Sequence, residues 1–460
     1  MEEVTIDTKD PEIGARLDRL PSSRKLWTLV ALLSLGGFFE YYDLFFTGYI
    51  APGLVRSHIL TTTTPGLLGS AGIAGFVAAM FAGLFIGTSA CSFVADRFGR
   101  RAIFTFSLLW YTAATVIMAF QNSAFGLNLW RFIAGIGVGV ELVTIDAYIS
   151  ELVPKRLRGR AFAYNQTIQF CAVPIVALFA RLLVPIAPLG LDGWRWVVLI
   201  GATGAIFVWW IRLRVPESPR WLVQHGRIEE ALRALESLEL PTETKRPYVQ
   251  QESLSKESTG RFVEMWQPPY LRRTVMLVVF HCFQTVGFYG FSNWVPTLLV
   301  ERGIAVTSSL RYTFAIAIAA PFGPLLAAAI ADKFERKWQM VASACGIAVF
   351  GLVFAQARAA AALIVLGMLV TLSNNVLSYA FHTYQAELYP TRIRARAVGF
   401  VYSWSRLSVV FSSFAIAFFL DRFGVPGVFA LIAGCMFVVM LSIGLLGPRT
   451  GNLPLEEIAQ

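Results

Sequence analysis

Long apolar runs separated by short polar segments fill most of this chain. Each run has about 20 residues or more, the length that an α-helix needs to cross roughly 30 Å of hydrocarbon. The runs form two sets of six, at 26–53, 66–94, 102–121, 124–150, 160–185 and 195–213, and at 271–299, 309–331, 338–357, 359–386, 396–419 and 424–447. The pattern predicts an all-α membrane protein with twelve transmembrane helices.

The two sets carry similar polar residues at a constant offset of 236 positions. Asp146, Tyr148, Glu151, Pro154, Arg156, Arg158 and Arg160 correspond to His382, Tyr384, Glu387, Pro390, Arg392, Arg394 and Arg396. The same offset relates Asp96-Arg97-Phe98 to Asp332-Lys333-Phe334, and Arg100-Arg101 to Arg336-Lys337. One period across separate segments indicates an internal duplication. We therefore expect two pseudo-symmetric six-helix bundles with a binding site at their interface, as in membrane transporters.

The polar segments suggest the domain boundaries. We expect a cytoplasmic tail at 1–25, a six-helix bundle at 26–213, a linker at 214–270, a second bundle at 271–447 and a tail at 448–460. The linker stretch that begins at Gly226 has an apolar stripe at helical spacing, which predicts a short helix lying against the bundle. The polar N-terminal stretch lacks the apolar core of a cleaved signal peptide.

Composition agrees with a membrane protein and predicts its orientation. The chain of 460 residues is 56% hydrophobic and 15% charged, with a mean hydropathy of +0.60, which is too little charge for a soluble protein of this length. The net charge of +10 comes from Lys and Arg spread over many short loops, which excludes a nucleic-acid-binding face. With the N-terminus inside, the outer segments hold only Arg56, Arg181, Arg195, Arg302, Arg311, Arg358 and Arg422. The positive-inside bias therefore predicts cytoplasmic N- and C-termini.

Motifs of enzymes and metal sites do not stand out. The five cysteines lie singly in apolar runs, without the spacing of metal ligands or of a disulfide framework. Gly135, Gly137 and Gly139 lie inside an apolar helix, where small residues allow close helix packing rather than nucleotide binding. We expect no enzymatic activity, no metal and no cofactor other than a proton that drives transport.

Two segments resemble the major facilitator superfamily, within it the sugar-porter-like branch. The fourth helix contains Ile133-x-Gly135-Ile136-x-x-Gly139 followed by Tyr148-x-x-Glu151 and Arg158, and the sixth ends in Pro216-Glu-Ser-Pro-Arg-Trp221. The resemblance spans all twelve helices and implies a monomer that works by alternating access.

Departures from the hexose carriers of that branch shift the expected substrate. Tyr289 stands where those carriers have an Asn in helix seven, and Ser378 to His382 replaces a Gly-Pro-rich segment in helix ten. Ser92, Ala328 and Glu335 replace glycines of the cytoplasmic motif. The chain is more similar to bacterial proton-coupled metabolite and aromatic-acid symporters, and to organic-ion carriers.

Ionisable residues within the spans are the candidates for proton coupling, because each costs free energy in a bilayer. Glu40 and Asp43 share one face of helix one, and Arg131 lies at a similar depth in helix four. The resemblance implies that Asp43 pairs with Arg131 and takes up a proton when the Arg moves away; the alternative is a permanent structural pair. For Glu40 we expect a structural role ahead of a role in proton coupling.

Arg406 is the candidate for substrate binding, because it lies near the middle of helix eleven and helices seven to twelve offer no acid at that depth. Its partner is then either a carboxylate across the interface or an anionic substrate, which a guanidinium binds bidentately. Further candidates for the site are Gln166, Gln169, Gln284, Tyr289, Asn293, Trp294, Trp404 and Tyr41.

Four more polar residues could relay protons. Glu141, Asp146, His281 and His382 lie within helices four, seven and ten. A His can change its charge near neutral pH, although a neutral, hydrogen-bonded His in the core is the commoner case. Glu141 could serve either the proton path or the site.

A set of charged residues at the inner ends of the helices predicts a cytoplasmic gate. It comprises Asp96, Arg97, Arg100, Arg101, Glu151, Arg158, Glu217, Arg220, Asp332, Arg336, Glu387 and Arg394. The resemblance implies that these groups pair across the two bundles when the outer mouth is open, and separate when the inner mouth opens. Charge patches that merely hold the orientation are the alternative.

These observations predict a secondary active transporter of the plasma membrane, in bacteria the inner membrane. Its expected partners are lipid, protons and a small-molecule substrate, an organic anion such as an aromatic or hydroxy monocarboxylate imported by symport. A proton-coupled antiporter that expels drugs or organic ions is the alternative within transport. A metabolite receptor that does not transport is the alternative from another class.

Overall fold

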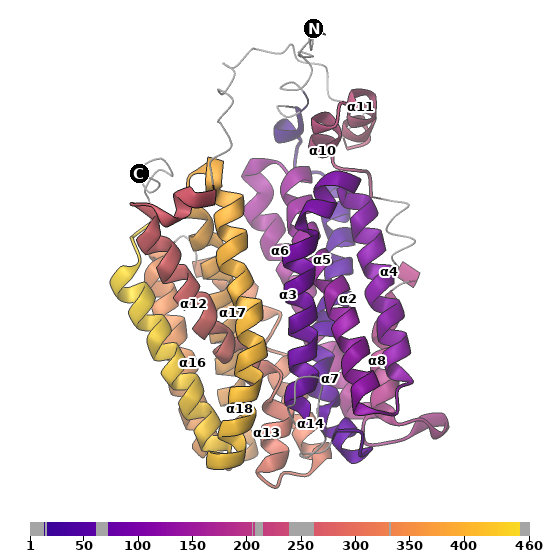
Figure 1. The fold of residues 1–460 in the computed structure, drawn as a ribbon, viewed down its shortest axis with the longest axis vertical. Coiled ribbons are helices and arrows are strands. Elements are labelled where there is room, and N and C mark those ends of the chain that lie inside the picture. The colour runs from indigo at the N-terminus through magenta and orange to yellow at the C-terminus, as the bar shows by residue number, and fades with distance from the viewer. Residues whose placement is uncertain are drawn as a thin grey trace.

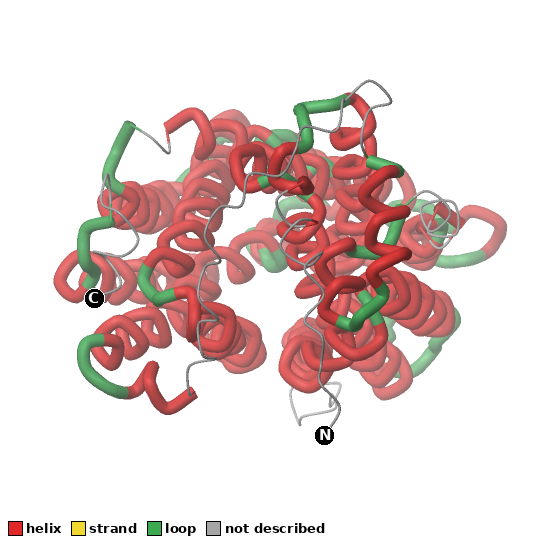
Figure 2. The backbone as a smooth tube through the Cα atoms, turned by 90° about the horizontal axis from the view of Figure 1, so that it is seen from above, coloured by secondary structure: helices red, strands yellow, loops and turns green. Residues whose placement is uncertain are grey.

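Helices make up nearly all of the described chain, in two groups that lie side by side (Figure 1 and Figure 2). This computed structural model describes residues 13, 16–60, 72–204, 206–207, 215–238, 262–330 and 333–450, with backbone alone at 90–98, 100, 142–144, 146–147, 155, 224, 391–392 and 395. The first group is formed by the N-terminal half and the second by the C-terminal half, so the fold is the one the duplication predicts.

The first half contains the helical segments of the first six predicted spans. They are α2 (Arg24–Arg56), α3 (Ile73–Phe98), α4 (Arg100–Ala119), α5 (Ala124–Leu152), α6 (Arg158–Phe170) with α7 (Ala172–Leu183), and α8 (Gly193–Ala202). Short 3-10 turns precede α6 at Lys155–Leu157 and α8 at Pro188–Gly190. Asp96, Arg97, Arg100 and Asp146 were predicted site residues, and their side chains lie outside the described part.

The second half repeats this order. Its helices are α12 (Tyr270–Ser292) with α13 (Val295–Glu301), α14 (Val306–Ala317) with α15 (Phe322–Ile330), α16 (Arg336–Gln356), α17 (Ala360–Glu387) and α18 (Thr391–Leu441), with a 3-10 turn at Phe262–Trp266 before them and a π-turn at Ser442–Leu446 after them. Gly424 has φ 64° and interrupts α18 just before Pro426, so this long helix supplies the last two spans. Asp332 lies outside the described residues.

Eight helical segments in the described part are long and apolar enough to cross a membrane. Because one of them is the interrupted α18, they supply nine of the predicted spans. The other three are α3, whose described apolar stretch is Ile73–Ser89; α5, which carries several ionisable residues; and α8, which continues outside the described residues.

Local sequence explains where several helices begin. The hydroxyl of Ser23 accepts a hydrogen bond from the backbone N–H of Leu26 at 3.1 Å, and Ser123 caps α5 through Gly126 at the same distance. Such caps satisfy backbone donors that have no partner within the helix. Helices α2 and α5, which carry Asp43 and Arg131, therefore both begin directly after a capping serine.

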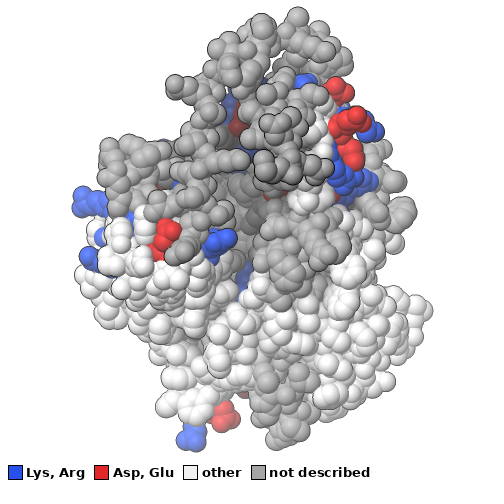
Figure 3. Space-filling model, turned by 45° about the horizontal axis from the view of Figure 1, so that its top comes forward, with Lys and Arg blue, Asp and Glu red and all other residues white. Residues whose placement is uncertain are grey.

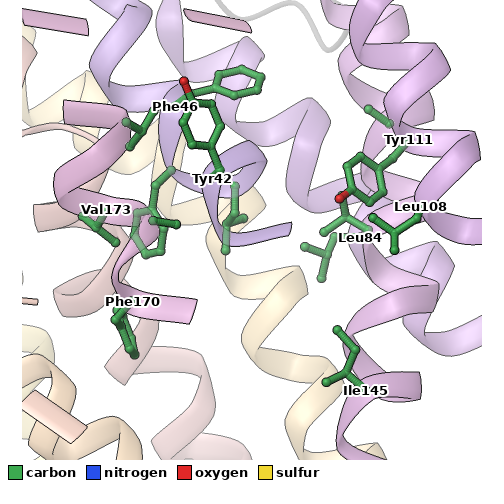
Figure 4. Close-up of a cluster of buried hydrophobic side chains, with 14 of the residues drawn as sticks. Tyr42, Phe46, Leu84, Leu108, Tyr111, Ile145, Phe170 and Val173 are labelled. Atoms are coloured by element: carbon green, nitrogen blue, oxygen red, sulfur yellow. The ribbon is translucent and has the colours of Figure 1, made fainter. Parts of the chain in front are cut away.

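Glycines bring α3 and α5 into close contact. A Cβ on Gly83 would lie 2.1 Å from the carbonyl oxygen of Phe132, and one on Gly135 would lie 2.3 Å from that of Met80. Large side chains surround this contact; in Figure 4, Leu84 of α3 and Tyr111 of α4 approach each other. The prediction that the glycines of this helix serve packing is confirmed.

The duplication is visible in individual hydrogen bonds. The Nε–H of Arg158 donates to the carbonyl oxygen of Val153 at 3.2 Å, and that of Arg394 donates to Tyr389 at 3.1 Å. Both donors and both acceptors are 236 positions apart. The hydroxyls of Tyr148 and Tyr384 likewise donate to the proline carbonyls that follow their bundles, at 216 and 448.

Charged side chains gather at the two ends of the molecule, and the band between them is almost free of them on the face shown (Figure 3). The end with more charge also carries the linker helices α10 (Pro219–Gln224) and α11 (Ile228–Glu236) (Figure 1). Helix α11 buries Ala231, Ala234 and Leu235, as the apolar stripe of the linker predicts. The bare band has the character of a lipid-facing surface.

Candidate functional site

Asp43 and Arg131 form an ion pair inside the first bundle. The Nη1 of Arg131 lies 2.8 Å from Oδ2 of Asp43, and Nη2 donates to the backbone oxygen of Asp43 at 2.6 Å. Both side chains are buried. The structure therefore brings together the two residues that the sequence predicts as a pair.

Neutral groups and rings complete the surroundings of this pair. The hydroxyl of Thr115 donates to Oδ1 of Asp43 at 2.9 Å, and Thr47 accepts from Arg131 at 2.5 Å. The guanidinium lies 4.3 Å from the ring centre of Phe46 and 5.5 Å from that of Phe76. Sequence analysis missed both threonines, because a hydroxyl in an apolar helix has no distinctive pattern.

Two more acids lie near this ion pair. Glu40 and Glu141 are fully buried, and the Glu141 carboxyl is close enough to Glu40 and Asp43 to interact with both electrostatically. Among the described residues, neither carboxyl oxygen of Glu141 has a hydrogen-bond partner. The hydroxyl of Tyr111, which also interacts with Glu141, has none in that part of the chain either. The first bundle thus buries three acids near one Arg.

A cavity with a mixed polar and apolar lining lies between the two halves. In this structure the space accessible to a water-sized molecule is about 30 Å³, so the cavity is narrow and would have to widen to hold a metabolite. Its lining comes from α2, α12, α17 and α18, and comprises Tyr41, Leu44, Phe45, Gln284, Thr285, Phe288, Tyr289, Ser378, Phe381, His382, Tyr402, Ser405 and Arg406. Both bundles therefore contribute, as the duplication predicts.

Arg406 is the charged group of the cavity, and its partners differ from the carboxylate considered in the sequence analysis. Its Nη1 donates to the hydroxyl of Tyr289 at 2.6 Å, and its Nη2 donates to that of Tyr402 at 2.8 Å. Its Nε has no hydrogen-bond partner among the described residues, and no described carboxylate lies within salt-bridge distance of it. The cation is buried, with 2% of its surface exposed. The described lining of the cavity thus holds a buried cation whose hydrogen-bond partners are neutral hydroxyls.

Rings close the cavity toward the C-terminal end of α2. Phe45, Phe170 and Phe288 have ring centres 6.4 Å apart in each pair. Phe45 and Phe288 also line a second, more apolar cavity that extends to Tyr49 and Val295. Helices from both bundles therefore meet at this aromatic contact.

The structure places some predicted substrate residues in the cavity and others outside it. Tyr41, Gln284 and Tyr289 line it. Trp404 lies in a separate apolar groove beside Cys282 and Phe411, in contrast to the prediction. Residues two positions apart in an α-helix are rotated by about 200° about the helix axis. Trp404 and Arg406 therefore face opposite sides of α18.

The remaining predicted substrate residues also lie outside this cavity. Gln169 packs against Gly37, where a Cβ would lie 2.3 Å from its amide nitrogen, and its neighbour Gln166 is partly buried. Asn293 and Trp294 are buried just after the C-terminal end of α12, where the backbone oxygen of Asn293 would lie 2.4 Å from a Cβ on Gly48.

The two histidines predicted as relays have different surroundings. His281 is fully buried, 2.9 Å from the amide oxygen of Gln385, and does not line the cavity. His382 lines it, and its Nδ1 lies 2.7 Å from the backbone oxygen of Ser378. Of the two, His382 is therefore placed to contact a substrate.

Several cavity residues were missed by the sequence analysis. Tyr402 lies one helical turn before Arg406, and this spacing could have identified it as a partner. The rings of Phe45, Phe288 and Phe381 carry no such signal, since aromatic residues are abundant throughout this chain.

Several described residues of the predicted cytoplasmic gate contact partners within their own half. Arg336 pairs with Glu387 at 2.9 Å, and Arg220 pairs with Asp18 at 2.9 Å. Glu217 accepts hydrogen bonds from the backbone N–H of Arg101. Glu151 is half-buried, and Arg158 and Arg394 bond to backbone carbonyls. Among the ion pairs of the described chain, none joins the two halves.

Two bundles of membrane-spanning helices around a cavity that contains buried polar groups define a multi-pass membrane transporter, and comparison with known proteins agrees. The model of the sugar (and other) transporter family matches residues 29–460. YyaJ of Bacillus subtilis, which is named for metabolite transport, is 32% identical over 441 residues, which is 95% of each chain. The niacin transporter NiaP of Acinetobacter baylyi is 28% identical and covers 97% of this chain and 99% of its own.

A solved structure shows the same fold. The inward-open xylose transporter XylE of E. coli matches with a TM-score of 0.72 at 21% identity, over 94% of this chain and 99% of that one. The chain belongs to the sugar (and other) transporter family, within the major facilitator superfamily. It is therefore a transporter and not an enzyme, and the predicted fold class is confirmed.

Proposed function

We propose that this protein imports a small organic anion together with protons across the bacterial inner membrane. The observation that carries the proposal is Arg406, a buried cation that faces the cavity between the bundles with tyrosine hydroxyls as its partners. A buried charge without a counter-ion is costly, and a carboxylate provides one with the geometry that a guanidinium prefers. The relatives support this class, because one is a niacin transporter and niacin is a small carboxylate.

The residues around Arg406 favour a monocarboxylate. A tyrosine hydroxyl that accepts a hydrogen bond from the guanidinium keeps its own hydrogen for donation. Tyr289 can therefore donate to an anion held by Arg406. The cavity offers one cation in its described lining, which suits one negative charge.

Asp43 and Arg131 are proposed to couple transport to protons. The ion pair requires an ionised Asp43, so it represents the state after the proton has left. The carboxyl would take up a proton again when the Arg moves away, since burial favours the neutral acid once the cation is lost. Glu141, buried and without a hydrogen-bond partner in the described chain, is a second proposed proton carrier. Glu40 and the relay candidate Asp146 belong to the same bundle.

Helix α3 offers a physical link between the proton pair and the cavity. Phe76 lies against the guanidinium of Arg131, and Phe81 lies 4.6 Å from the ring centre of Tyr289, which binds Arg406. Movement of Arg131 would therefore be transmitted to the substrate site through one rigid helix.

The state seen here is proposed to be closed outside. The outer ends of α2 and α12 meet at Gly48 and Asn293, and α14 packs on α7. At the opposite end, the ion pairs Arg336–Glu387 and Arg220–Asp18 each lie within one half, as expected when an inner mouth opens. With the N-terminus in the cytoplasm and a monomer as the working unit, this state would release substrate inward.

Transport in vesicles tests the proposal. Purified protein in liposomes with an acidic exterior should accumulate a labelled aromatic monocarboxylate, and an ionophore that dissipates the pH gradient should abolish accumulation. Accumulation driven by an acidic interior would instead favour the antiporter. Binding without accumulation under either gradient would favour a receptor.

A further inference from the structure

We propose that His382 makes the cavity selective for aromatic monocarboxylates that carry a hydrogen-bond donor, a hydroxyl or an amino group, on the ring. The proposal rests on the proposed function, because it assumes that Arg406 holds the carboxylate. It adds the class of substituent and the residue that recognises it.

The hydrogen bond of His382 determines which of its ring nitrogens faces the substrate. Its Nδ1 lies 2.7 Å from the backbone oxygen of Ser378, and a carbonyl oxygen only accepts. Nδ1 therefore carries the hydrogen, and in the neutral ring Nε2 is left with a lone pair. The cavity-lining imidazole thus presents an acceptor.

Neighbouring rings hold this imidazole in place. It stacks on Phe381 with ring centres 4.1 Å apart and an angle of 27°, and it meets the ring of Tyr402 at 5.5 Å. The hydroxyl of Tyr402 binds Arg406 at 2.8 Å. The acceptor and the cation therefore contact the same tyrosine.

We place a planar substrate between these two groups, in a state of the transporter in which the cavity is wider than here. Its carboxylate would bind Arg406 and Tyr289, and its ring would lie among the aromatic walls at Tyr41, Phe45 and Phe288. A hydroxyl or amino group on the far side of the ring would donate to His382 Nε2. Without that donor the nitrogen would lose its hydrogen-bond partner once the bound substrate excludes water, and a substrate nitrogen or oxygen that only accepts would face its lone pair.

The size of this selectivity follows from the cost of an unpaired buried group. That cost is about 1–3 kcal/mol, which corresponds to a factor of about 5 to 150 in affinity. We therefore expect 3- or 4-hydroxybenzoate to bind at least about fivefold more tightly than benzoate. Nicotinate, whose ring nitrogen only accepts at neutral pH, should also bind more weakly.

The experiment compares these four probes on full-length protein reconstituted in liposomes, by competition against uptake of one labelled hydroxybenzoate and by calorimetry. His382→Phe keeps a ring but removes the acceptor, so it should abolish the preference without weakening benzoate, which then leaves no ring nitrogen unpaired. His382→Gln restores an acceptor oxygen and should retain part of the preference. This variant keeps the proposal testable if His382→Phe fails to fold.

His225 supplies the matched control. Its Nδ1 lies 3.0 Å from the backbone oxygen of Trp221, and its ring stacks on that of Trp221, but it is exposed on α10 outside the cavity. His225→Phe should leave the order of affinities unchanged.

Two results would overturn the inference. One is a wild-type protein that binds benzoate or nicotinate as tightly as the hydroxybenzoates. The other is a His382→Phe variant whose affinity for all four probes falls by the same factor. In either case the proposed function still stands if Arg406→Ala weakens the binding of every carboxylate by about 10- to 100-fold. If no carboxylate binds at all, the proposed function fails instead.

Discussion

Single residues in this protein carry charge where a membrane tolerates little of it. Asp43 and Arg131 neutralise each other inside one bundle, whereas Arg406 has neutral tyrosines as its hydrogen-bond partners. The two arrangements call for different chemistry. The ion pair can be opened by a proton, and the second cation can be neutralised only by something that enters the cavity.

Replacing Asp43 separates proton coupling from binding. Asp43→Asn keeps an oxygen that can accept from Thr115 but cannot carry the exchangeable proton. We expect accumulation driven by a pH gradient to be lost while exchange of substrate across the membrane continues. Counterflow measurements in liposomes distinguish the two activities.

The stability of this variant must be followed as well, because removing one partner of a buried ion pair costs about 3–5 kcal/mol. Asp192→Asn is the matched control, since Asp192 lies 3.6 Å from Arg195 in an ion pair whose carboxylate is largely exposed. It should alter neither activity. Gradient-driven accumulation by Asp43→Asn equal to that of the wild type would exclude the coupling role.

Replacing Arg406 tests anion recognition. Arg406→Ala should lower the affinity for a monocarboxylate by about 10- to 100-fold, since hydrogen bonds to charged groups contribute about 1.5–3 kcal/mol. The affinity for the corresponding neutral amide should change much less. Arg406→Lys should restore only part of the affinity, because an ammonium lacks the planar fork. Equal losses for the acid and the amide, measured by thermal shift, would mean that Arg406 serves structure alone.

At the scale of the helices, contact between glycine and backbone sets where the halves meet. Gly48 of α2 lies against the backbone of Asn293. The aromatic cluster of Phe45, Phe170 and Phe288 lies about one helical turn away along α2. Together they form a contact between α2 and the second half, which we propose closes the outer side.

A side chain at position 48 should therefore block this closure. A Cβ there would lie 2.4 Å from the carbonyl oxygen of Asn293, so Gly48→Val requires the two helices to separate. We expect uptake to fall severely while binding from the outer side is kept. Gly434→Val, at a helical glycine with no atom within 4 Å of the added Cβ, is the control for helix propensity. Normal uptake by Gly48→Val would show that the contact is not needed for the cycle.

At the scale of the whole molecule, the two halves repeat one design and differ in their charges. Arg158 and Arg394 make the same hydrogen bond in each half. The acids, by contrast, gather in the first bundle, and the buried cation of the cavity belongs to the second. We infer that the first half carries protons and the second holds the anion, so rocking of one half against the other couples them.

Accessibility from each side of the membrane tests the proposed inward-facing state. Ser378 lines the cavity. In a variant whose native cysteines are replaced, Ser378→Cys should react with an impermeant maleimide faster from the cytoplasmic side, and substrate should slow the reaction. Faster labelling from outside, measured in right-side-out and inverted vesicles, would contradict the proposed state.

The linear pattern determined the number of membrane spans, the duplication and the positions of the buried charges. These features follow from the sequence because a bilayer requires each span to be long and apolar and makes every unpaired charge costly. Both requirements hold regardless of how the helices pack against one another. The pairing of Asp43 with Arg131 could be predicted for the same reason: within the first bundle, few charges share that depth.

Only the tertiary structure decided which neutral groups meet the charges. Trp404 faces away from the cavity that Arg406 enters, and Tyr402 and Thr115 supply hydrogen bonds that no sequence pattern marks. The rotation of each helix about its axis depends on how it packs against its neighbours. Hydroxyls and rings are tolerated on any face of an apolar helix, so their partners are set by that packing.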